Sequence, residues 1–426
     1  MGLPSDAALV HLGNFDVESD WARGEIGMLP PRADSPDPLA SRMAELALLL
    51  GNENDYVVLQ TQPDHDYISY LRELRLSVPH ILTVDDPEFK GNLATAALAS
   101  PRLTAQLADL ARAGAHLVPH GVSRDVEALA RRAGLPFAAA PSARCKQVNS
   151  KIYGRRLADA LRLQQPAGSA CESIDELQAA VAEARRLLDR GASVVVKDAF
   201  GVSGRGLIVV DTHRHLDRVA RLITARAGDH TRVGIIIEEW VTRHADLHYH
   251  ATIGRDGGVS LDCVLETILS DHGVPMGNRA PTAITRVHHA ELARCAAVVG
   301  ARLYSDGFFG TVGVDAMVGP AGLYPLVEIN ARHTLCTYQI QLRERFLADQ
   351  GTSAARYYPL RATRFAELRE RMGDLMFDRR RGTGLLVTGC MAGRLHGLIF
   401  AEDEAEAGEL DDEISQALAG GAAHGF

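Results

Sequence analysis

The feature that most constrains the fold of this chain is a predicted hairpin in its last third, where two strand-like stretches read GTVGVDAMV and LYPLVEINAR. A glycine-rich turn at residues 319–322 joins them. Because alternate residues of a strand point to one side, Glu328, Asn330 and Arg332 share a face, and the hairpin brings Asp315 near it. Such oxygen ligands suit Mg²⁺, and the arginine can reach a transferring phosphoryl group. The alternative is an exposed salt-bridged strand, which is costly on an apolar hairpin without a ligand.

A second motif, VVVKDAFGVSGRGLIVV, places a glycine-rich turn between two apolar stretches at residues 194–210. Glycine lacks the Cβ that would keep backbone N–H groups away from a phosphate, and Lys197 adds a positive charge. A strand rather than a helix follows the turn, so neither a Walker loop nor a dinucleotide fingerprint fits. A glycine-rich hairpin without a ligand is the alternative. The predicted phosphate-binding turn comprises Gly201, Ser203, Gly204, Arg205 and Gly206.

Weaker signals flank this turn. Lys151 falls in the first turn of a predicted helix at residues 150–163, where a cation is unfavourable unless it has a partner such as a phosphate. The stretch IIIEEWV at residues 235–241 is an apolar strand that stops at two carboxylates, and its backbone can offer an acceptor and a donor to adenine. Asp246 follows closely and can accept from ribose hydroxyls. The alternatives without a ligand are a solvated lysine and an ordinary strand end.

The chain divides into three regions by the pattern of its predicted strands and helices. Before residue 142, strands and helices alternate, which predicts a parallel α/β layer. Its strands are expected at residues 8–12, 56–59, 80–84 and 116–119, its helices at 38–50 and 124–133, and a Pro-rich loop at 30–38. The second region adds a helix at 174–190, capped by Ser173 and Glu176, and strands at 193–197, 234–241 and 247–253. Domains are therefore predicted at residues 1–141, 142–346 and 347–426.

Charge and cysteine content exclude several classes of protein. The formal net charge of −9 argues against nucleic acid as the main partner, since phosphate backbones require a basic surface. Six cysteines form no Cys-x-x-Cys pair, which favours reduced thiols. The N-terminus MGLPSD is unlike a signal peptide, and no apolar run approaches a membrane span. We expect a soluble, cytoplasmic protein.

Taken in order, these motifs resemble the ATP-grasp superfamily over residues 143–345, most specifically in the Glu328-x-Asn330-x-Arg332 hairpin. The segments VNSKIYGRRLA, KDAFGVSGRG and EINARHT resemble those of the branch that has a pre-ATP-grasp domain. This branch includes the peptide ligase of pheganomycin biosynthesis. The resemblance implies an α/β fold. A pre-ATP-grasp α/β domain would precede a two-lobed α+β ATP-grasp domain with a lid at residues 163–234, and the C-terminal segment would complete or cap that domain.

The resemblance also implies the ligands. ATP and one or two Mg²⁺ ions are expected, and Mn²⁺ can substitute. Lys151 and Lys197 would contact the phosphates, with residues 201–206 as a flexible loop over them. Adenine would lie against Glu238, Glu239, Trp240 and Val241, and the ribose against Asp246.

Asp315, Glu328 and Asn330 are the implied metal ligands, and Arg332 would stabilise an acyl phosphate together with Lys197. Arg279, in the predicted loop MGNRAP, is added as a second anion ligand without a motif match. His248 and His250 share one face of a predicted strand, with His244 nearby, which could suggest zinc. Spacing places no third ligand, so a polar strand face that lines or edges the site is favoured.

The implied reaction is an ATP-dependent carboxylate–amine ligation through an acyl phosphate, releasing ADP and phosphate, in the biosynthesis of a small peptide or peptide-like natural product. The partners would be a small carboxylate and an amine or peptide, with a homodimer as the default assembly. The alternative acceptor is a carrier-protein thiol, with the Arg-rich residues 361–381 as a docking candidate. A nucleotide-binding module without chemistry is disfavoured because the metal ligands are present; a carboxylase or kinase on the same fold stays open.

Overall fold

The structure is a computed structural model that describes residues 7–28, 38–137, 139–201, 206–228, 232–269, 275–348, 351–360, 364–391 and 393–419. The Pro-rich loop, except Pro38, and the turn residues Ser203, Gly204 and Arg205 lie outside these ranges. Within them, no helix combines the length and the apolar character that a membrane crossing requires.

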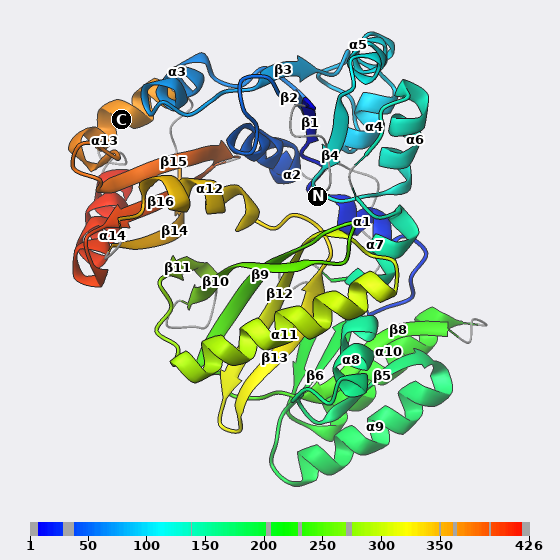
Figure 1. The fold of residues 1–426 in the computed structure, drawn as a ribbon. Helices are drawn as coiled ribbons and strands as arrows, with labels where there is room; N and C mark the ends of the chain where they lie inside the picture. The colour runs from blue at the N-terminus through cyan, green and yellow to red at the C-terminus, as the bar shows by residue number, and fades with distance from the viewer. Residues whose placement is uncertain are drawn as a thin grey trace, which may run out of the picture.

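The first region is a parallel four-stranded sheet in the order β3-β2-β1-β4, as the alternating pattern predicted (Figure 1). Helix α6 ends where expected, because Ser123 caps its start and Gly134 adopts a left-handed φ of 65° after its end. The strands are β1 (Leu9–Leu12), β2 (Tyr56–Leu59), β3 (His80–Thr83) and β4 (His116–Pro119). The helices are α1 (Val17–Ala22), α3 (His65–Glu73), α4 (Leu93–Leu98), α5 (Pro101–Arg112) and α6 (Arg124–Ala133).

The helix expected at residues 38–50 differs from the prediction. It is a short α-helix, α2 (Pro38–Met43), followed by a 3₁₀ helix, η1 (Ala44–Leu49). Every residue of η1 is buried, and a Cβ on Gly13 would lie only 2.6 Å from the Cα of Ala44. Close packing on all sides of this segment therefore overrides the one-sided pattern that the sequence suggested.

A separate small sheet, in the order β5-β8-β6-β7, carries the glycine-rich turn. Ser173 and Glu176 form the predicted capping box at the start of α9. Its antiparallel strands are β5 (Gly168–Ser173), β6 (Val194–Asp198), β7 (Leu207–Val210) and β8 (Arg232–Glu239). Helices α9 (Ile174–Asp189) and α10 (His213–Ala227) pack on it, and α7 (Ser142–Asn149) and α8 (Lys151–Ala160) precede it.

An eight-stranded sheet holds the rest of the chain, in the order β13-β12-β9-β10-β11-β14-β16-β15. Strands from the second region and from residues after 347 therefore belong to one sheet. The strands are β9 (Ala245–Ile253), β10 (Val259–Leu269), β11 (Pro275–Ala280), β12 (Gly310–Gly319), β13 (Gly322–Asn330), β14 (Thr352–Pro359), β15 (Gly384–Met391) and β16 (Arg394–Ala401). Helices α11 (Arg286–Ser305), α12 (Thr337–Phe346), α13 (Phe365–Met372), α14 (Glu404–Ala419) and the short η2 (Gly373–Leu375) accompany it.

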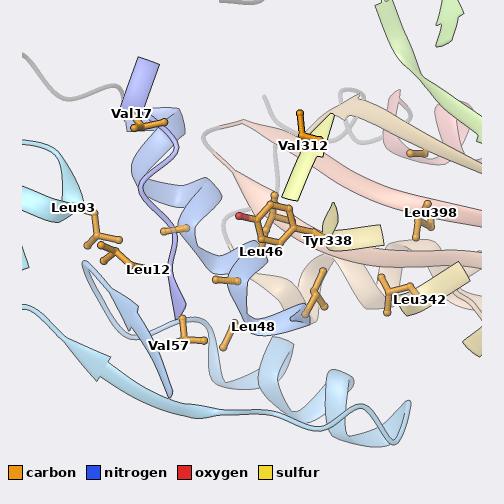
Figure 2. Close-up of a cluster of buried hydrophobic side chains, with 14 of the residues drawn as sticks. Leu12, Val17, Leu46, Leu48, Val57, Leu93, Val312, Tyr338, Leu342 and Leu398 are labelled. Carbon is orange, nitrogen blue, oxygen red and sulfur yellow. The ribbon is translucent and has the colours of Figure 1, made fainter. Parts of the chain in front are cut away.

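Two large hydrophobic cores distinguish these parts. One continuous core runs from the first sheet into the large sheet, and Figure 2 shows Leu12 and Val57 of the first region together with Tyr338 of α12 and Leu398 of β16. A second core lies in the small sheet and its helices and includes Val196, Ile235 and Leu216, together with Met28 of the first region. The small sheet therefore buries its apolar side chains in a cluster distinct from the core of the other two sheets.

Candidate active site

The predicted hairpin brings three of its polar side chains to one face. Asp315 pairs in register with Glu328, and Gly313 pairs with Asn330. Asn330 donates its Nδ2–H to Oδ2 of Asp315 at 3.2 Å. On the neighbouring strand β9, His248 is opposite Asp315, and its Nδ1 lies 2.7 Å from Oδ1 of that carboxylate. Two carboxylates and an amide oxygen on a shared face are hard oxygen donors, which fits Mg²⁺ with phosphate oxygens completing its shell.

Burial and neighbouring charges shift the pKa values of three side chains on or beside this face. Burial acts to raise the pKa of Asp315, but the hydrogen bond and charge of His248 hold it below its ordinary value. Burial raises the pKa of Glu328 despite the adjacent Lys151. Burial also opposes the charge of His248, yet the neighbouring Cys336 and Asp315 raise its pKa to about 10. Among the described residues no group of three or more His, Cys, Asp and Glu side chains is placed to hold a metal ion.

Both lysines predicted to bind phosphate form ion pairs with carboxylates. Lys151 Nζ is 2.5 Å from Oε1 of Glu328 and also donates to the carbonyl of Gly201 at 3.0 Å. Lys197 Nζ is 2.5 Å from Oε1 of Glu238, whose Oε2 accepts from Arg155 at 3.0 Å. These ion pairs hold two cations, of which Lys151 lies between Glu328 and Gly201, at positions where phosphate oxygens could replace the carboxylates.

The strand end predicted to hold adenine lies where the small sheet connects to β9. The backbone N–H of Glu239 donates to the carbonyl of Ala167 at 2.7 Å, and that of Trp240 donates to the carbonyl of Ser193 at 2.9 Å. Both donors are therefore engaged, and the Glu238 side chain is engaged by its cations. An adenine bound here would need Val241 as its backbone donor.

Asp246 lies on the same strand face as His248, two residues away. Its Oδ1 accepts from Arg243 at 3.1 Å, and burial raises its pKa. The other oxygen, Oδ2, is buried and accepts no hydrogen bond from the described residues. A buried acceptor without a donor is costly, so this oxygen suits a ligand hydroxyl.

Arg332 is brought to the face that carries Asp315 and Asn330, whereas Arg279 is not. Arg332 NH2 donates to Oδ1 of Asn330 at 3.1 Å. Arg279 lies in strand β11 rather than in the predicted loop, and it forms ion pairs with Glu266 at 2.8 Å and Glu404 at 2.6 Å.

The register explains where Arg279 points. It is opposite Glu266, which is opposite Leu247, and Leu247 points away from the face that carries His248. A register shift between Leu261 and Cys263 sets this alternation, because a shift of one residue exchanges the two faces. The structure thus corrects the predicted place of Arg279.

Two further charged residues of the site, Arg155 and Glu18, were missed by sequence reasoning, whereas His248, predicted on a polar strand face, lies 2.7 Å from Asp315. Arg155 is one turn along the helix from Lys151, a spacing that places both on one side. Glu18, which binds Arg332, has no local signal because 314 residues separate the two.

Comparison with known proteins identifies the architecture. Residues 43–135 match the family described as the Pre ATP-grasp domain. An N5-carboxyaminoimidazole ribonucleotide synthetase from Thermus thermophilus superposes with a TM-score of 0.56 at 15% identity, covering 96% of this chain and 98% of that one. A biotin carboxylase from Campylobacter jejuni gives a TM-score of 0.56 at 13% identity, with 97% and 91% covered.

The chain has the ATP-grasp fold, with a pre-ATP-grasp domain. The predicted fold class is thereby confirmed, while the likeness to the pheganomycin ligase stays a prediction. The chain is also 29% identical over 298 residues to the [butirosin acyl-carrier protein]–L-glutamate ligase of Niallia circulans. That match spans 69% of this chain and 65% of the length of that relative.

Proposed function

We propose that this chain is an ATP-dependent ligase that activates a carboxylate as an acyl phosphate and transfers the acyl group to a nucleophile. The observation that carries the proposal is the convergence of Asp315, Glu328 and Asn330 with Lys151 and Arg332 on one face. Solved relatives of this fold include complexes with ADP and with its magnesium salt, which supports ATP and Mg²⁺ as ligands.

The proposed chemistry is phosphoryl transfer followed by acyl transfer. A substrate carboxylate oxygen attacks the γ-phosphorus, the bond to the β-phosphate oxygen breaks, and ADP leaves. A nucleophile then attacks the acyl carbon and phosphate leaves. Each step brings negative groups together, so catalysis depends on positioned positive charge. Asp315, Glu328 and Asn330 would hold Mg²⁺, which supplies charge neutralisation on the phosphates when bound.

The roles of the cations follow from their present partners. Lys151 and Lys197 would exchange Glu328 and Glu238 for phosphate oxygens, since a lysine can point its three donors at either. Arg332 would face the transferred phosphoryl group. Residues 201–206 would cover the phosphates, and Asp246 would accept from the ribose.

We further propose that the small sheet and its helices form the lid predicted at about residues 163–234, with its hinge at residues 238–241, although strand β8 of this sheet continues to Glu239. Its separate core supports independent motion. Closure would exclude water from the acyl phosphate, which hydrolyses. The domain limits at residues 141 and 346 stay predictions of the same kind, although strands β14 to β16 lie in the large sheet.

The acceptor has two candidates. An amine acceptor would make the chain a carboxylate–amine ligase of peptide-like natural products. The name of the curated relative, which describes ligation of L-glutamate to an acyl-carrier protein, favours a carrier-protein acceptor. Of the Arg-rich segment proposed to dock such a carrier, residues 361–363 lie outside the described chain.

Nucleotide products test the proposal. The protein would be incubated with ATP, Mg²⁺, hydroxylamine and a panel of amino acids, because hydroxylamine intercepts an activated acyl group whatever the natural acceptor. ADP and a hydroxamate formed with one donor, and lost in Lys197→Ala and Glu328→Ala, are expected. AMP and pyrophosphate would overturn the acyl-phosphate mechanism. Replacing hydroxylamine by an amine panel or by a pantetheinylated carrier protein, with mass spectrometry, then distinguishes the two acceptors.

A further inference from the structure

The guanidinium group of Arg332 is held on three sides. Its Nε and NH2 donate to Oε1 of Glu18 at 2.8 and 2.5 Å. NH2 also donates to Oδ1 of Asn330 at 3.1 Å, and NH1 donates to the carbonyl of His333 at 2.9 Å. The Arg332 side chain is 15% exposed and that of Glu18 is 7% exposed. This is a fixed, nearly desolvated pair rather than a surface salt bridge, so its geometry is well defined.

Glu18 is fixed in turn by the first region. It lies in α1, where Trp21 Nε1 donates to the carbonyl of Val122 at 3.1 Å. Just before α1, Asn14 Nδ2 donates to the carbonyl of Gly121 at 2.8 Å. A Cβ on Gly121 would lie 2.7 Å from Cγ1 of Val17, so the backbone there packs directly on the helix. The helix that carries the carboxylate is therefore packed on and hydrogen-bonded to the loop that follows β4.

Without this carboxylate, Arg332 has competing partners. Asp315 lies close enough that the charge of Arg332 contributes to lowering its pKa, and Glu328 is on the same face. An arginine loses considerable rotamer freedom when it is fixed, on the order of 2 kcal/mol, so it takes one orientation only where its donors are all engaged. An unbraced Arg332 would turn toward the metal-binding carboxylates and away from a phosphoryl group.

We propose that Glu18 is a positioning residue, through which the pre-ATP-grasp domain holds Arg332 in its productive orientation. The inference rests on the proposed ligase function, in which Arg332 faces the transferred phosphoryl group. It assigns to the first region a part in the catalytic centre of the ATP-grasp domain. Glu18 itself touches no reacting atom; it acts through Arg332.

A double-mutant cycle on turnover tests this role. Glu18→Gln keeps the shape of the side chain and removes its charge. We expect the kcat of donor-dependent ADP formation to fall about 10- to 100-fold, as for a misplaced catalytic group, while the KM for ATP changes less than about threefold. Glu18→Asp should recover part of kcat. In an Arg332→Ala background, Glu18→Gln should cause no further loss, because its only effect passes through the arginine.

The outcomes separate the two proposals. Glu25→Gln is the matched control, since Glu25 lies in the same N-terminal segment and pairs with Lys146 at 2.6 Å instead of with Arg332; it should keep the wild-type kcat. An unchanged kcat in Glu18→Gln, or an equal loss in the Arg332→Ala background, would overturn the positioning role alone. Absence of donor-dependent ADP formation by the wild-type protein would instead refute the ligase proposal, and the role of Glu18 with it.

Discussion

Breaking the ion-pair cluster around Glu238 should destabilise the small sheet strongly. This carboxylate lies between Lys197 at 2.5 Å and Arg155 at 3.0 Å, and the exposed fractions of the three side chains are 9%, 14% and 9%, respectively. Glu238→Gln keeps the volume but can accept from only one cation, and it presents its NH₂ group to the other. Lys197 then loses the carboxylate it pairs with, and Arg155 keeps only the more distant Asp159 at 3.8 Å; breaking such a buried pair costs about 3–5 kcal/mol.

Urea unfolding followed by tryptophan fluorescence would measure this loss. The chain has two tryptophans, so in a Trp21→Phe background the signal comes from Trp240, next to the cluster. We expect the midpoint to fall by the equivalent of about 3–5 kcal/mol, and saturating Mg·ATP to restore part of it, because phosphates supply the missing negative charge.

Glu239→Gln is the matched control at the next position of the strand. A loss below about 1 kcal/mol in Glu238→Gln, the range of an exposed pair, would refute the reasoning. So would a loss equal to that of the control.

Three further predictions concern stability. Burial lowers the pKa of His396 from 6.5 to about 3. Below pH 6.5 the unfolded chain therefore binds a proton at His396 that the folded protein does not bind. Stability should be lost as pH falls from 6.5 toward 3, by up to about 1.4 kcal/mol per pH unit. His396→Gln should flatten this slope in urea titrations from pH 7 to 5, and the exposed His65→Gln should leave it unchanged. Burial raises the pKa of Asp20 from 3.8 to about 6, so its contribution is present below pH 4 and is lost as pH rises through 6; Asp20→Asn should raise stability at pH 7 by roughly 1–3 kcal/mol, and no gain would contradict the burial argument. A Cβ at Gly277 would lie 1.7 Å from the carbonyl oxygen of Ala355, so Gly277→Ala should lower the stability by on the order of 3 kcal/mol or more. Gly408 lies in an open helical position, so Gly408→Ala should raise the stability by roughly 0.5–1 kcal/mol. Thermal unfolding of the two variants tests the sign of each change.

Local patterns in the sequence determined much of this protein. The two-residue period of a strand was enough to place Glu328 and Asn330 on one face, because side-chain alternation is a property of the backbone itself. The caps at Ser173 and Gly134 likewise act within one turn of helix. Alternating strands and helices predicted the parallel first sheet, since parallel neighbours require crossover connections.

Tertiary structure decided what depends on contacts between distant segments. The direction of Arg279 follows from a register shift near Leu261, which a sequence pattern does not show. The 3₁₀ form of η1 follows from packing on every side. The partner of Arg332 lies 314 residues away on α1, and its choice among Glu18, Asp315 and Glu328 is made by the geometry of the assembled domains. A sequence states which charges exist, but only the folded chain sets their distances, and distance and burial decide which pairs form.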